Sequence, residues 1–199
     1  MHQSSYQKMR VFRDRYLHER RGQPLAVLDV GAMDVNGSYR DLFDDARWTY
    51  RGVDLEAGRN VDIVLERPYA LPLASASQDV IISGQALEHM PYFWLFFLEV
   101  FRCLKPDGLA CIIAPSAGYE HRHPVDCWRF YPDGMSAAAR FARLEPVEIY
   151  TDWQPVGDYD DDSRVWQDSV LIARKPALSA WRHIKLAGRA WVLGWLGGR

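Results

Sequence analysis

Short apolar runs alternate with amphipathic segments along the first three quarters of the chain. We expect helices between the apolar runs. A further helix is expected at the N-terminus, because apolar residues recur at helical spacing between Tyr6 and Tyr16. The apolar runs have the length and the boundaries of buried strands: residues 25–31, 50–56, 61–66, 78–85 and 109–115. The further helices are expected at 38–46, 92–104 and 132–144.

Two late strands are expected in EPVEIYTDW and SVLIARK, joined by an acidic loop. Apolar strands that alternate with helices predict a mostly parallel sheet covered on both faces. We divide the chain into an N-terminal helix (1–24), one α/β domain (25–176) and a C-terminal tail (177–199).

Composition and charge narrow the class of protein. The formal net charge of −2 gives no reason to expect nucleic acid as a partner. The first residues lack the apolar run of a signal peptide, and no apolar run is long enough to span a bilayer. Cys103 and Cys111 lie in apolar segments, so a reducing, cytoplasmic location is expected.

The ends of the first two strands carry residues typical of a nucleoside site. In parallel sheets, ligands bind beyond the carboxyl ends of the strands. Gly31 follows the first strand and permits a sharp turn close to a ligand, while Asp54 ends the second strand, where an acid can accept both ribose hydroxyls. The alternative is an ordinary turn with a solvated aspartate.

The phosphate-binding signals of a dinucleotide site are missing. The second glycine of G-x-G-x-x-G is replaced by Met33, and no Lys-Ser/Thr pair follows the strand. A nucleoside ligand without phosphate, such as S-adenosylmethionine, therefore fits better than NAD.

The order of motifs resembles the class I S-adenosylmethionine-dependent methyltransferases, in particular the type 11 group. The matching segments are VLDVGAMDVNGS, YRGVDLE, ALPLASASQDVIIS, QALEHM and FRCLKPDGLACIIAP. The resemblance implies a single Rossmann-like domain with a mostly parallel seven-stranded sheet, an antiparallel last strand and helices on both faces. It also implies methyltransferase activity with S-adenosylmethionine as cofactor.

The resemblance assigns cofactor-binding roles by position. Asp54 matches the ribose-binding acid and Leu55 the apolar contact to adenine. Arg67 stands where relatives usually have an acid for the adenine amino group, and Glu66 is the substitute we consider. The remaining positions surround the methionine part and the sulfonium: Asp29, Gly31, Ala32, Met33, Gly37, Gly84 and Gln85.

The acceptor is expected to be a hydroxyl. The fourth strand is followed by SGQALEH and not by the Asn/Asp-Pro-Pro-aromatic motif of many amide and base-nitrogen methyltransferases. A hydroxyl needs a base, and His89 lies at the expected place. The alternative is that Glu88 and His89 only hold the start of a helix.

The segment HRHPVDCWRFYP follows the fifth strand and is the second candidate for acceptor contact. His121 and His123 are candidate bases, Asp126 a candidate orienting residue, and the aromatic residues candidates for stacking on a sugar. One alternative is a packed connector. Another is a metal site of His121, His123 and Asp126, although relatives of this type usually need no metal.

The tail 178–199 mixes tryptophans with arginines and a lysine, which is typical of a helix that lies on a membrane or packs on the protein body. A peripheral membrane contact and a homodimer are the partners considered. The predicted function is O-methylation of a saccharide, a lipid-linked acceptor or a small molecule. The alternatives are an inactive nucleoside-binding relative and an NAD or nucleotide-sugar enzyme.

Overall fold

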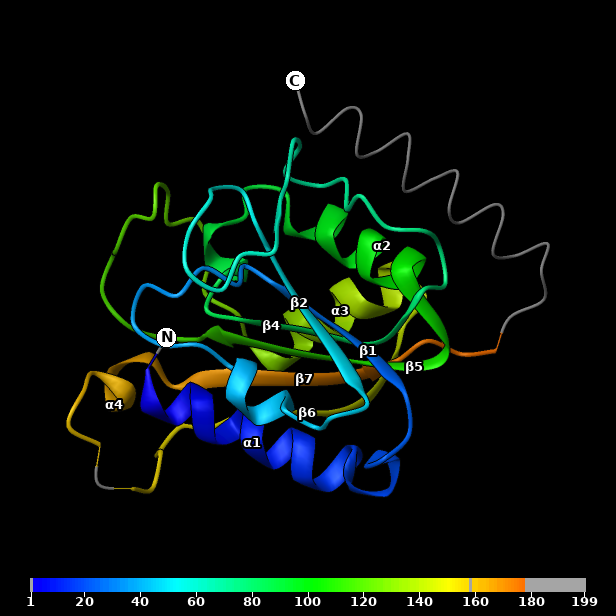
Figure 1. Cartoon of the computed structure of the whole chain (residues 1–199). Helices are drawn as coiled ribbons and strands as arrows, with labels where there is room; N and C mark the ends of the chain where they lie inside the picture. Colours follow the sequence, from blue (N-terminus) through cyan, green and yellow to red (C-terminus); the bar gives the residue numbers. More distant parts are fainter. Residues whose placement is uncertain (1, 158, 178–199) are drawn as a thin grey trace.

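The computed structural model describes residues 2–157 and 159–177, which form one α/β sandwich (Figure 1). The helices are α1 (Gln3–Tyr16), α2 (Phe93–Cys103), α3 (Pro132–Phe141) and α4 (Ser163–Trp166), with 3-10 turns η1 (His18–Arg20), η2 (Arg40–Phe43) and η3 (Leu87–His89). The strands are β1 (Leu25–Val30), β2 (Trp48–Asp54), β3 (Ile63–Val64), β4 (Gln78–Gly84), β5 (Leu104–Pro115), β6 (Glu145–Thr151) and β7 (Asp168–Arg174).

The strands form one seven-stranded sheet in the order β3-β2-β1-β4-β5-β7-β6. All pairs from β3 to β5 are parallel, whereas β7 runs antiparallel to both β5 and β6. The predicted fold class, including the antiparallel last strand, is confirmed. The order reverses between β1 and β4, and this reversal places the ligand-binding edge at the carboxyl ends of these strands.

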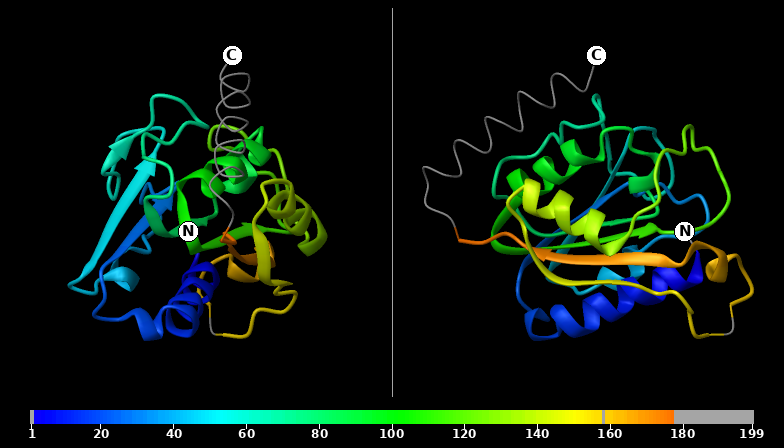
Figure 2. Two further views of the ribbon diagram at one scale, coloured as in Figure 1. Left: turned by 90° about the vertical axis from the view of Figure 1, so that its right-hand side faces the viewer. Right: turned by 180° about the vertical axis from the view of Figure 1, so that it is seen from behind.

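Helices cover both faces of the sheet, as expected from strands that are apolar on both sides (Figures 1 and 2). The apolar side chains of α2 and α3 pack on one face, with Phe97 and Met135 fully buried. On the other face α1 lies along the sheet and buries Met9 and Phe12. The N-terminal helix is thus one of the layers of the domain.

The prediction of a helix at 38–46 is wrong, because only the 3-10 turn η2 forms there. The side chains of Ser38 and Asp45 accept hydrogen bonds from the backbone N–H groups of Arg40 and Arg47. Such local bonds stabilise turns at the expense of a continuing helix. Leu42 and Phe43 still reach the core, so the apolar pattern is satisfied without a full helix.

The segment KPDG (105–108) lies inside β5 as an irregularity. Leu104 pairs with Gln78, and the next regular pair is Leu109 with Val80. Asp107 has a positive φ of 61°, and its N–H donates to the carbonyl of Lys175. The last residues before the tail therefore fasten the start of β5.

The expectations for the tail 178–199 lie outside the described residues. Within the described part of the chain, none of the helices combines the length and hydrophobicity needed to cross a membrane.

Candidate active site

The glycine loop after β1 is held by backbone hydrogen bonds at the carboxyl end of the sheet. The N–H groups of Gly31 and Ala32 both donate to the carbonyl of Val53 in β2. Gly31 has a φ of +78°, and a Cβ there would collide with Ala86. Only glycine fits this turn without strain, as the sequence predicted.

Asp54 joins the ends of β1 and β2. Its Oδ2 accepts from the N–H of Met33 at 3.0 Å and its Oδ1 from the N–H of Leu55 at 2.7 Å. The carboxylate is partly exposed, and each oxygen keeps a further lone pair for a ribose hydroxyl. Leu55 is 50% exposed beside it, as an apolar contact to adenine requires.

Asp29 is a buried acid close to the glycine loop. The hydroxyl of Tyr50 donates to its Oδ2, while Oδ1 has no hydrogen-bond partner among the described residues. Burial raises the pKa of Asp29 to about 7. An ammonium group placed at Oδ1 would supply the missing donor, so Asp29 suits the amino group of a bound amino-acid moiety.

Side chains from other elements crowd the end of β4, where Gly84 and Gln85 were predicted to contact the cofactor. Gly84 lies against the phenol of Tyr39, whose hydroxyl is 2.7 Å from Oγ of Ser5. The side-chain Nε2 of Gln85 donates to Oδ1 of Asp168 at 3.0 Å. Gln85 therefore connects β4 to β7, and sequence reasoning missed Asp168, whose only signal was an acid at the start of an apolar strand.

The other predicted cofactor positions lie on exposed loops. Glu66 and Arg67 are both exposed after β3. Gly37 donates its N–H to Oδ1 of Asp34, beside an open groove of about 820 Å³ that Arg59 and Asn60 also line. The groove adjoins η2, where a helix was expected.

Three histidines from two segments meet beyond the carboxyl ends of β4 and β5. The ring of His89, in η3, lies 4.9 Å from that of His121 and 5.8 Å from that of His123. Nδ1 of His89 is 2.6 Å from the carbonyl of Val125, so it carries the proton and leaves Nε2 with a free lone pair. Burial lowers the pKa of His89 and keeps its ring neutral near pH 7.

Glu88 is fully buried next to the histidines. Its Oε1 lies 3.7 Å from Nε2 of His89, and neither oxygen has a hydrogen-bond partner in the described part of the chain. Burial raises the pKa of Glu88 to about 8. Its backbone carbonyl accepts from the N–H groups of Cys127 and Trp128, which fastens the connector 116–131 to η3.

Asp126 holds the connector in shape. Arg129 donates to both of its oxygens, at 2.6 and 2.9 Å, and the N–H of His121 donates at 2.8 Å. Arg129 holds the pKa of Asp126 well below its usual range. Nδ1 of His121 lies 3.4 Å from Oδ2 of Asp126, so the predicted pair is in proximity, but the main partner of Asp126 is Arg129.

The aromatic residues of the connector divide into buried and exposed ones. Phe130 is buried against Phe93, whereas Trp128 is 38% and Tyr131 55% exposed. Tyr131 stacks on Trp153 with ring centres 6.0 Å apart. The connector is therefore both a packed segment and an exposed aromatic surface.

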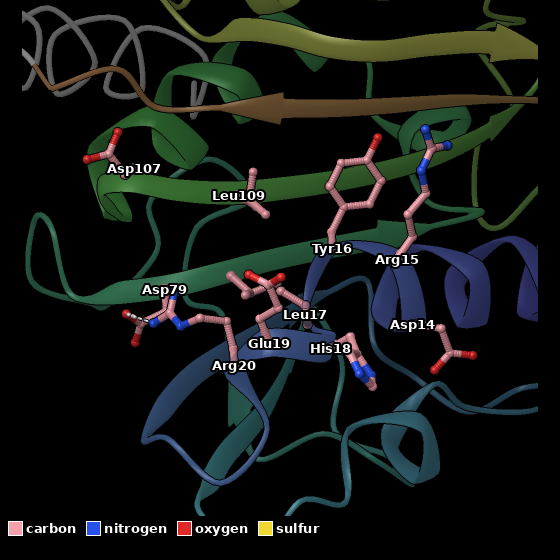
Figure 3. Close-up of a pocket in the computed structure, with 11 residues that line it drawn as sticks. Asp14, Arg15, Tyr16, Leu17, His18, Glu19, Arg20, Asp79, Asp107 and Leu109 are labelled. Carbon is pink, nitrogen blue, oxygen red and sulfur yellow. Dashed lines mark ion pairs between the residues drawn. The ribbon is translucent and has the colours of Figure 1, made fainter.

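A separate cavity of about 450 Å³ lies at the opposite end of the sheet, between the end of α1, η1 and the starts of β4 and β5 (Figure 3). Its charged groups include Arg20 and Asp79, and Asp79 is also paired with Lys105. Its position at the amino end of β4 does not fit the rule for ligands in parallel sheets.

Comparison with known proteins agrees with this geometry. Residues 28–112 match the family model described as "Methyltransferase domain". An "Uncharacterized methyltransferase" of Mycobacterium bovis is 32% identical over 133 residues, which cover 59% of this chain and 50% of the relative. One of Mycobacterium ulcerans is 32% identical over 142 residues, which cover 62% and 53%.

Solved structures share the fold. The 1,6-didemethyltoxoflavin-N1-methyltransferase of Burkholderia thailandensis, solved with S-adenosylhomocysteine, has a TM-score of 0.65 at 19% identity and covers 87% of this chain and 79% of its own. The [4+2]-cyclase SpnF has a TM-score of 0.63 at 16% identity, covering 86% and 83%.

Residues 28–112 are thus similar to a methyltransferase domain, and the described chain shares the fold of a methyltransferase solved with S-adenosylhomocysteine. The chain spans about half the length of the curated relatives it matches.

Proposed function

We propose that the protein transfers a methyl group from S-adenosylmethionine to a hydroxyl of a saccharide, a lipid-linked saccharide or a small molecule. The observation that carries this proposal is the meeting of His89, His121 and His123 beyond the carboxyl ends of β4 and β5. Imidazoles are suited to remove a hydroxyl proton near pH 7.

The residues after β1 and β2 fit the cofactor. When bound, S-adenosylmethionine supplies an electrophilic methyl group on a sulfonium. Asp54 would accept hydrogen bonds from the ribose hydroxyls, Leu55 would contact the adenine, and Oδ1 of Asp29 would hold the ammonium group. These contacts bind and orient the donor, and orientation alone contributes much of the rate in such transfers.

The connector would bind and activate the acceptor. Nε2 of His89 has the free lone pair needed to accept a proton, and His121 and His123 lie close enough to share this task. Asp126 acts as a positioning residue, because it fixes the segment that carries both of the latter histidines. The exposed rings of Trp128 and Tyr131 support a sugar acceptor, since aromatic faces stack on sugar rings.

The test is methyl transfer from labelled S-adenosylmethionine to paired acceptors that differ only in a hydroxyl or an amine, including free and lipid-linked saccharides. We expect label in the hydroxyl compounds, with the new C–O bond verified by NMR of the product. Transfer to the amine partners alone would contradict the proposal.

A further inference from the structure

We propose that Glu88, His89 and His121 form a binding site for a divalent transition metal ion, for which Zn²⁺ is the probe. One ligand atom of each residue lies within 4.8 Å of those of the other two. One carboxylate and two imidazoles are the donor set of many three-ligand zinc sites, which leave a position open for water or substrate. The site differs from the combination of His121, His123 and Asp126 that the sequence suggested, because Asp126 is bound by Arg129.

The buried carboxylate of Glu88 is the strongest sign of a missing ligand. Its side chain is inaccessible to solvent, and both oxygens are without hydrogen-bond partners among the described residues. A buried, unpaired carboxylate is costly. Protonation would remove the charge, but it would leave the new O–H and the other oxygen unpaired. A cation between Glu88 and the imidazoles satisfies both the charge and the coordination of the oxygens.

The ring of His89 is arranged as metal-binding imidazoles usually are. Zinc–ligand bonds of about 2.0–2.2 Å place tetrahedral ligand atoms about 3.4 Å apart. Oε1 of Glu88 and Nε2 of His89 are 3.7 Å apart, so this pair needs little movement. The other ring nitrogen of His89 is bound to the carbonyl of Val125, and a carboxylate oxygen of Asp126 lies 3.4 Å from Nδ1 of His121. A carbonyl partner of this kind orients the imidazole of His89 for metal binding, whereas Nδ1 of His121 has no hydrogen-bond partner among the described residues.

The site lies where a bound ion would act on an acceptor. A metal ion lowers the pKa of bound water by several units and would do the same for a coordinated hydroxyl. This consequence rests on the proposed function, and in that case the ion would replace the imidazole of His89 as the activating group. Metal binding itself requires neither cofactor nor acceptor.

The experiment is calorimetric titration of the metal-stripped 199-residue chain with Zn²⁺. We expect one ion per chain at micromolar affinity or better, and at least about 100-fold weaker binding in both Glu88→Gln and His121→Ala. Glu88→Gln keeps the shape of the buried side chain, and thermal unfolding checks that each variant is folded. His18→Ala, which removes a histidine at the other end of the sheet, should bind as the wild type does.

Cys127→Ser is the control for a rival site, because the thiol of Cys127 is exposed and its backbone N–H donates to the backbone carbonyl of Glu88. Its binding should be unchanged. The proposal is overturned if the wild type does not bind Zn²⁺. It is equally overturned if Glu88→Gln and His121→Ala both bind normally, or if only Cys127→Ser loses the ion. Because no S-adenosylmethionine or acceptor is present, each of these results is separate from a failure of the proposed methyl transfer.

Discussion

The two halves of the candidate active site are built in different ways. On the side of β1 and β2, backbone N–H groups, a glycine and two aspartates at the ends of two paired strands define the site. On the side of β4 and β5, side chains from η3 and from the connector 116–131 come together. The first half of the site therefore follows from how the loops after β1 and β2 leave the sheet. The second half depends on how the connector packs on η3.

The two halves should respond separately to substitution, and His89→Ala tests this most severely. We expect kcat to fall by about 10²–10⁴-fold, because the variant lacks the group proposed to receive or direct the proton. The affinity for S-adenosylhomocysteine should stay within about threefold, since His89 is placed on the acceptor side. Steady-state kinetics and calorimetry measure the two quantities. His18→Ala serves as the matched control, and equal loss of both quantities in His89→Ala would break the division into halves.

Asp54→Ala is the converse experiment. It removes the carboxylate that bridges the loops after β1 and β2 and is proposed to hold the ribose. We expect the affinity for S-adenosylhomocysteine to fall about 100-fold, or about 2.7 kcal/mol. Glu56→Ala, an exposed acid two residues further on, should change little. An unchanged affinity in Asp54→Ala would remove the main support for the cofactor half.

The connector offers a comparison between two arginines. Arg129 pairs with Asp126, whose side chain is 3% exposed, whereas Arg122 pairs with Glu120, whose side chain is 63% exposed. Arg129→Ala should lower the free energy of unfolding by about 1–3 kcal/mol, because the buried carboxylate of Asp126 loses its charged partner and keeps only the hydrogen bond from the N–H of His121. Arg122→Ala should change it by less than about 0.5 kcal/mol. Urea denaturation would measure both, and equal effects would contradict a structural role for the Asp126–Arg129 pair.

The last prediction concerns Asp29 and depends on pH. The pKa of Asp29 in the folded protein, about 7, is above its value in the unfolded chain. The stabilisation that Asp29 gives to the ligand-free protein is therefore fully present below about pH 4 and is lost as the pH rises to about 7. Asp29→Asn should therefore be the more stable form at pH 8, with the difference closing towards pH 4.

The same substitution should weaken binding of S-adenosylhomocysteine about tenfold at pH 8, because the ammonium group loses its counter-charge. Thermal unfolding and calorimetry at pH 5 and 8 test both statements, with Asp44→Asn as the exposed control. Tighter binding by Asp29→Asn at pH 8 would contradict the role assigned to Asp29.

The sequence predicted β1 and the end of β5 well, because the apolar runs 25–31 and 109–115 are bounded by proline and glycine, and it correctly placed Gly31 and Asp54 at strand ends. The strand predicted at 61–66 is shorter in the structure, where only Ile63–Val64 pairs. The sequence also predicted a helix at 38–46 that does not form, because hydrogen bonds to the side chains of Ser38 and Asp45 favour turns there. It named the three histidines individually, but the meeting of His121 with Glu88 and His89 depends on how the connector folds back over η3. No local pattern encodes that fold, nor the link from Gln85 to Asp168.

The most direct test of the central claim is calorimetric titration of the wild-type protein with S-adenosylhomocysteine, with NADH as the comparison ligand. The account predicts micromolar binding of S-adenosylhomocysteine, about −8 kcal/mol, and no binding of NADH. Binding of NADH alone would indicate a dinucleotide enzyme. Failure to bind either ligand would contradict the cofactor site formed by Asp29, Gly31 and Asp54.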